Sequence, residues 1–258
     1  MRSFKLNVLL LLVFSAVLFS CKEDDDDNNN NNQPTQSVTN PAPDFPDADG
    51  ILAAIVVKTY QEVPVIGVQG IETEQAFAQI NEVGSNTVLA DAGTVTCNTV
   101  ELGNIGGNQY IFPNPNNPTA MDDMQLDDND PVAWDISGSA DVDALSYTTN
   151  AGVPDEFDFV TVQETASAGS AFTIEIDQVP TQADSILWLL VEESSGDLVR
   201  HTTANNVVSY TFTAAETADL SGNVLAYAVA YNYDLVTSGG RNLYFINEYV
   251  LLKTTEFQ

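Results

Sequence analysis

The sequence is poor in the residues from which most catalytic and zinc sites are built. Its 258 residues include one histidine and two cysteines. A Ser-His-Asp or Cys-His arrangement would have to use His201, which lies beside Arg200 in a threonine-rich run and is expected to be an exposed strand residue. Zinc sites need clusters of cysteine and histidine, so the composition argues against one. We therefore expect no enzymatic activity.

Basic residues are also scarce, at 7 lysines and arginines against 37 acids, for a net charge of -30. A surface of this sign repels phosphate backbones, which argues against binding to nucleic acid. It also offers no basic patch for anionic lipids. Membrane attachment, if there is any, must therefore come from another source.

The N-terminus has the pattern of a secretory leader. Arg2 and Lys5 precede an apolar run over residues 6–19. As a helix this run would be about 21 Å long, too short for a hydrocarbon core of roughly 30 Å. The pattern therefore predicts a signal peptide over residues 1–20 rather than a membrane-spanning helix.

The residues around the expected cleavage site resemble a bacterial lipobox, with Leu-Phe-Ser-Cys at positions 18–21. The resemblance implies a diacylglyceryl thioether and an acyl chain such as palmitate on Cys21, which would anchor the protein stably. The run that follows resembles the export signal of surface lipoproteins of the Bacteroidota. It consists of Lys22, Glu23, Asp24, Asp25, Asp26 and Asp27. This resemblance implies the outer membrane, with the protein facing the cell exterior.

Residues 21–44 are expected to form a lipidated, disordered tether, because their Asn, Gln, Ser, Thr and Pro bury little apolar area. As a flexible coil, residues 22–44 would span about 25–30 Å. Acylation of Cys21 would leave Cys97 without a disulfide partner. Cys97 is then expected to be a small buried residue on the strand face that it shares with Val95.

The rest of the chain predicts an all-β fold. Short runs of Val, Ile, Thr, Tyr and Phe are separated by Gly, Asn, Asp and Pro, with no sustained helical spacing. We expect two tandem antiparallel β-sandwich domains, over residues 45–150 and 151–258. Residues 113–131, rich in proline, are expected to be a surface loop or an excursion between strands.

The second domain resembles an immunoglobulin-like or fibronectin-III-like sandwich. The resemblance implies a core place for Trp188 and a tyrosine corner at Tyr227. The seven expected strands are Phe157–Gln163, Ala171–Asp177, Asp184–Glu193, Leu198–Thr202, Val207–Thr213, Asn223–Asp234 and Asn242–Leu252. The first domain is less regular, with expected strands at Ile51–Tyr60, Val63–Gln69, Gln75–Ile80, Thr94–Thr99, Gln109–Phe112, Val132–Ser137 and Ala144–Thr148.

Two groups of residues are candidate binding sites. Calcium prefers oxygen ligands, and the densest acidic cluster contains Asp122, Asp123, Asp127, Asp128 and Asp130. A solvated loop is the alternative interpretation, and no other cofactor is expected. Three tyrosines near the last hairpin, Tyr231, Tyr233 and Tyr244, could stack on a glycan or anchor a protein partner. Packing within the fold is the alternative for them.

The layout as a whole resembles two-domain surface lipoproteins of the Bacteroidota, on the segments Pro46–Gly50, Phe212–Glu216 and Tyr244–Asn247. This resemblance implies no particular activity. We expect a non-enzymatic surface module for binding, adhesion or assembly. The alternatives are a polysaccharide hydrolase that uses paired carboxylates, and a substrate-binding accessory of an outer-membrane uptake complex.

Overall fold

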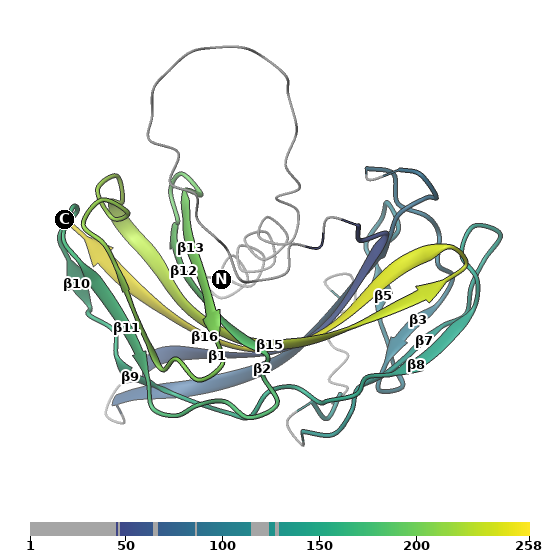
Figure 1. Cartoon of the computed structure of the whole chain (residues 1–258), viewed down its shortest axis with the longest axis horizontal. Helices are drawn as coiled ribbons and strands as arrows, with labels where there is room; N and C mark the ends of the chain where they lie inside the picture. The colour runs from purple at the N-terminus through teal and green to yellow at the C-terminus, as the bar shows by residue number, and fades with distance from the viewer. Residues whose placement is uncertain (1–44, 46, 64–66, 86, 115–123, 127–128) are drawn as a thin grey trace, which may run out of the picture. The chain divides into compact units, whose positions relative to one another are not determined.

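Figure 1 shows the computed structural model, which describes residues 45, 47–63, 67–85, 87–114, 124–126 and 129–258. These residues belong to one compact unit, Pro41–Gln258. The described part of the chain contains strands and turns but no helix, which confirms the all-β prediction.

The largest sheet has nine strands and draws them from both halves of the chain. Its order is β13-β12-β15-β16-β1-β2-β6-β5, and β10 pairs with β16 outside this path. The strands are β1 (Gly50–Val63), β2 (Gly67–Ile80), β5 (Gly103–Asn104), β6 (Gln109–Phe112), β10 (Thr165–Ala166), β12 (Ser185–Glu192), β13 (Leu198–Ala204), β15 (Gly222–Ser238) and β16 (Arg241–Phe257).

Two smaller sheets complete the fold. One has the order β14-β11-β9 and the other β4-β3-β7-β8. Their strands are β3 (Val95–Cys97), β4 (Val100–Glu101), β7 (Ala133–Ile136), β8 (Leu145–Thr148), β9 (Phe159–Thr161), β11 (Phe172–Ile176) and β14 (Ser209–Phe212).

The C-terminal half has the seven strands that the sequence predicts. The sheet β14-β11-β9 accompanies the order β13-β12-β15-β16 in the large sheet, as in an immunoglobulin-like sandwich. Trp188 is fully buried, and its indole N–H donates to Thr203 Oγ1 at 2.9 Å. The prediction of a tyrosine corner is wrong, because the motif needs a hydrogen bond from the tyrosine hydroxyl, and the buried Tyr227 hydroxyl has no partner.

The large sheet crosses the expected boundary between residues 150 and 151. Strand β16 pairs with β15 on one side and with β1 on the other. Its pairing with β1 is parallel, as is that with β10, so the expectation of purely antiparallel sheets is wrong at these two contacts. The two halves therefore share one sheet, and each has a small sheet of its own.

Both small sheets pack on the same face of the large sheet. On β16, Phe245 packs against Trp134 of β7, with ring centroids 6.4 Å apart, and Phe257 packs against Phe172 of β11 at 5.4 Å. Phe245 and Phe257 are an even number of positions apart, so they point to the same side of the strand. We call this side the core face, and its residues form one continuous hydrophobic cluster.

The opposite side, which we call the second face, is also apolar. Its residues alternate with those of the core face along β1, β15 and β16, and they do not belong to the core cluster. They include Ile51, Ala53, Ile55, Val57, Val229, Ile246, Val250 and Leu252, all buried. Strands that are apolar on both sides read as continuous hydrophobic runs, as in ILAAIVV of β1.

Candidate functional site

Most of the lipidation, export and calcium residues lie outside the described part of the chain. They are Cys21, Lys22, Glu23, Asp24, Asp25, Asp26, Asp27, Asp122, Asp123, Asp127 and Asp128. Asp130 is described and exposed. Within the described residues, no group of three or more His, Cys, Asp or Glu side chains could hold a metal ion.

The structure also shows the surroundings of Cys97, of two glycines and of His201. Cys97 is fully buried beside Val95, as expected, and burial raises the pKa of its thiol. Gly106 and Gly107 lie in the turn between β5 and β6 and have φ angles of 105° and 63°, which glycine adopts without strain. His201 is half-buried rather than exposed, because its ring stacks on Tyr210 with centroids 4.5 Å apart. It also hydrogen-bonds Glu216.

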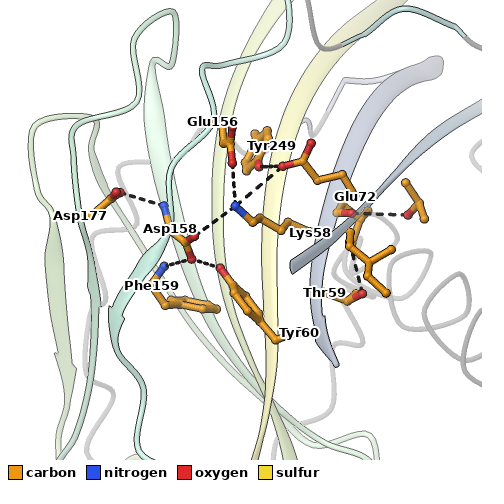
Figure 2. Close-up of polar contacts among 12 residues, drawn as sticks. Lys58, Thr59, Tyr60, Glu72, Glu156, Asp158, Phe159, Asp177 and Tyr249 are labelled. Atoms are coloured by element: carbon orange, nitrogen blue, oxygen red, sulfur yellow. Dashed lines mark hydrogen bonds and ion pairs between the residues drawn. The ribbon is translucent and has the colours of Figure 1, made fainter. Parts of the chain in front are cut away.

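A polar cluster joins the end of β1 to the segment before β9 (Figure 2). The amine of Lys58, only 8% exposed, donates to Glu156 Oε1 at 2.7 Å and to Asp158 Oδ2 at 3.1 Å. Tyr60 donates to the other oxygen of Asp158. Every one of these contacts links a strand of the N-terminal half to the first segment of the C-terminal half.

The electrostatics of this cluster indicate a structural joint. Burial alone would lower the pKa of Lys58, but the hydrogen bonds and charges of Glu156 and Asp158 outweigh it and raise that pKa. Burial would likewise raise the pKa of Asp158, but hydrogen bonds from Tyr60 and Lys58 lower it. The Lys58 amine already serves three carboxylates of this chain, since Glu72 Oε1 also lies 3.9 Å from it, so the cluster is better suited to holding the halves together than to binding a ligand.

The three candidate tyrosines all project from the second face. Tyr231 lies opposite Glu248, Tyr233 opposite Ile246, and Tyr244 opposite Ile51. Tyr231 and Tyr244 are buried rather than displayed for stacking. Phe45 packs its ring against Tyr244 at 4.5 Å and against Tyr233 at 5.4 Å. The fold thus places the three tyrosines on the second face. Two of them, Tyr233 and Tyr244, contact Phe45, where the described part of the chain begins.

Glu248 is a carboxylate placed among apolar side chains of the second face. Its cross-strand neighbours are Ile55 and Tyr231. It is 6% exposed, and its Oε2 has no hydrogen-bond partner. Burial raises its pKa from 4.5 to about 8, because the low-dielectric surroundings disfavour the charged form. Glu248 is therefore mainly a neutral carboxylic acid at pH 7.

Two further polar atoms of the second face are buried without a partner. They are the hydroxyls of Tyr227 and Thr202, which lie opposite Leu252 and Leu187 respectively. Buried polar groups are almost always hydrogen-bonded, since an unpaired one costs free energy. Along the strand direction, Tyr227 lies four residues from the row of Glu248, which corresponds to about 13 Å. The unpaired groups are therefore spread along the face rather than gathered at one point.

The second face is thus an apolar surface with a few separated hydrogen-bonding groups, and these groups are buried. The sequence contains one sign of a special residue on this face. Glu248 interrupts the apolar run of β16, written INEYVLL over residues 246–252. A single acid in a strand that is otherwise buried on both sides indicates a buried carboxylate with a special role.

Comparison with known proteins gives no family to which the chain could be assigned. No protein family model matches it, and no curated protein is similar to it in sequence. Among the residues that the structure describes, there is no helix with the length and hydrophobicity needed to cross a membrane. The second face and the leader sequence are therefore the features from which we infer a function.

Proposed function

We propose that the protein is a non-enzymatic, lipid-anchored surface module that binds an apolar ligand on the second face of its large sheet. The single observation that supports the proposal is the presence of Glu248, Tyr227 and Thr202 on that face, each with a buried polar atom that lacks a partner. Neither small sheet packs on this side. The side chains of this face are already buried, so a ligand would have to displace what covers them, and it would then supply the missing hydrogen bonds.

The leader sequence indicates where in the cell the proposed binding would take place. A lipid on Cys21 would hold the protein at the outer membrane, and residues 22–44 would let the folded part stand away from it. The described chain begins at Phe45, which packs against the tyrosines at one end of the second face. The tether would thus join the folded part next to the binding face.

Binding is favoured over hydrolysis by the surroundings of the acids. A glycosidase needs two carboxyl groups facing one another across the scissile bond. The raised pKa of Glu248 would suit a general acid, but its cross-strand neighbours are an isoleucine and a tyrosine. Glu156 and Asp158 lie close together, but both bind Lys58.

The proposal is tested by titrating the full chain, as processed by the cells that make it, with the uncharged dye Nile red. We expect saturable binding of the dye, weakened at least tenfold by Val229→Asp in the second face. Val160→Asp is the matched control, because Val160 is 56% exposed on β9. Circular dichroism melting establishes that each variant is folded.

If Val229→Asp does not fold, Tyr227→Leu replaces it as the test variant, since it also alters the second face but keeps an apolar side chain. Folded wild-type protein that binds no Nile red saturably would overturn the proposed function. Equal loss of binding in the Val160→Asp control would do the same, because the dye would then not report on the second face.

A further inference from the structure

We propose that the outer edge of β2 pairs with the same edge of a second copy of this chain. The two strands would run antiparallel about a two-fold axis at Ile71 and would join two large sheets into one. Such a contact uses a backbone edge that is exposed in the structure, and it does not depend on any ligand of the second face.

Strand β2 is paired on its outer side along only part of its length. It pairs with β1 along all 14 of its residues, whereas β6 pairs with it only at Ala76, Phe77, Ala78 and Gln79. Residues 68–73 are all exposed, and they include two large apolar side chains, Val68 at 59% and Ile71 at 39%. This stretch of β2 is therefore open for pairing with another strand.

The backbone of this stretch directs hydrogen-bonding groups outward. Asn81, which follows β2, donates its N–H to the Asp49 carbonyl on the β1 side at 2.6 Å. Because these groups alternate in direction along a strand, the odd-numbered residues of β2 face β1 and the even-numbered ones face outward. Gly70 and Glu72 thus present N–H and C=O groups that no strand in the described part of the chain pairs.

The edge has none of the usual features that prevent pairing. Proteins commonly protect a free edge with lysine, proline, a bulge or a very short strand. The register between β1 and β2 is unbroken, and residues 67–73 contain neither lysine nor proline and only one charged residue, Glu72. An exposed edge of this kind is suited to the addition of another strand.

A second copy fits this edge because the strand can pair with itself without placing like charges face to face. With Ile71 opposite Ile71 of the second copy, Glu72 lies opposite Gly70, and Gln69 lies opposite Thr73. The outward-facing Gly70 and Glu72 would then exchange backbone hydrogen bonds. The two isoleucines would meet as a non-hydrogen-bonded pair, where side chains approach most closely.

Charge also favours this register. A Cβ atom built on Gly70 would lie 2.6 Å from Lys58 Cε, so the lysine side chain packs against this glycine. Glu72 of the second copy, opposite Gly70, would therefore lie near a lysine, and opposite charges on neighbouring strands stabilise pairing. Repulsion between two chains of net charge -30 is screened beyond about 8 Å at physiological ionic strength.

Cysteine cross-linking on cells that make the full, processed chain tests the register. Under mild oxidation, Ile71→Cys should give a disulfide-linked dimer, because the two cysteines would face each other. Gln69→Cys is the matched control, since it lies on the same exposed face of β2 but would face Thr73. We expect at least tenfold more dimer from Ile71→Cys, and none from the wild type, in which Cys97 is buried.

Sedimentation of the purified full chain in detergent tests the strength of the contact. Ile71→Lys would place two lysines face to face, so it should raise the dissociation constant of the dimer at least tenfold. Val83→Lys is the control, because Val83 is 70% exposed in the turn after β2. It should stay within about threefold of the wild type. Thermal melting establishes that every variant is folded.

The opposite results would overturn the proposed pairing. They are equal cross-linking of the two cysteine variants, a wild-type chain that stays monomeric in both experiments, or a dimer that Ile71→Lys does not weaken. If Ile71→Cys instead forms a disulfide with a different protein, identified by its mass, the edge belongs to that partner and the pairing of two copies is wrong.

Discussion

The two faces of the large sheet have similar apolar side chains but treat their polar groups differently. On the core face, the amide of Asn247 donates to Asn232 Oδ1 at 3.0 Å and to the Ala151 carbonyl at 2.9 Å. On the second face, Glu248 and Tyr227 each have a buried polar atom without a partner. Unpartnered atoms also occur on the core side, at Trp134 Nε1 and Asn247 Oδ1, so the faces differ in that Asn247 of the core face also connects segments of this chain. The difference indicates that the core face contributes more of the contacts that stabilise the fold.

The largest expected effect comes from the core face. Phe245→Ala should lower the free energy of unfolding by about 3–5 kcal/mol, because Phe245 is fully buried and packs against Tyr147 at 4.6 Å. Urea denaturation measures this loss. Leu235→Ala is the matched control, since Leu235 is 51% exposed on β15. If Phe245→Ala lost less than about 1 kcal/mol of unfolding free energy, the claim that the core face contributes most to stability would be contradicted.

The next largest effect is expected at Glu248, where a substitution should raise the free energy of unfolding instead of lowering it. Its pKa is raised from 4.5 in the unfolded chain to about 8 in the folded one, so the folded state holds this proton more tightly. That stability is fully present below pH 4.5 and is lost as the pH rises towards 8. Glu248→Gln should therefore be more stable than the wild type at pH 8, by roughly 4 kcal/mol.

Thermal melts of both proteins at pH 4 and pH 8 measure this difference. The advantage of Glu248→Gln should shrink at pH 4, where the wild-type carboxyl is protonated in both states. A difference that is the same at the two pH values would mean that Glu248 is not buried as a neutral acid.

A smaller effect is expected at the joint between the halves. Lys58→Met should cost about 1–2 kcal/mol, since it leaves Glu156 and Asp158 without their shared amine. Both carboxylates are substantially exposed, so solvent screening limits the loss. Urea denaturation in low and high salt measures it. A cost of zero for Lys58→Met would mean that the cluster contributes nothing to joining the halves.

The smallest effect on stability is expected for Tyr227→Phe. This change removes a buried hydroxyl that has no partner, so the free energy of unfolding should stay within about 1 kcal/mol of the wild type or rise slightly. Calorimetry measures the change. A clear destabilisation would show that the hydroxyl has a partner in solution, and one of the three groups that mark the second face would be lost.

The sequence predicts individual strands better than their arrangement. The alternation of Phe172, Ile174 and Ile176 is a local pattern, so β11 is correctly predicted. The continuation of β15 beyond Asp234 is not, because Leu235–Ser238 lacks a sustained apolar run. That β1 pairs with β16 in parallel depends on contacts between distant segments, and local patterns contain no information about them.

The candidate site, like the fold, is predictable from the sequence only in part. Shared faces follow from spacing in a strand, so the grouping of Tyr231 with Tyr233 is predictable. Their burial is not, because it depends on what packs around them. The burial of Glu248 requires knowing that both faces of β16 are buried, which depends on what packs on each side of the sheet.

Native mass spectrometry of the processed protein, purified from the cells that make it, tests the central claim most directly. We predict a folded chain that carries the added mass of an apolar ligand, which organic extraction removes and which Val229→Asp lacks. A folded wild-type chain that shows only its own mass, and that takes up no Nile red when the dye is added, would contradict the account.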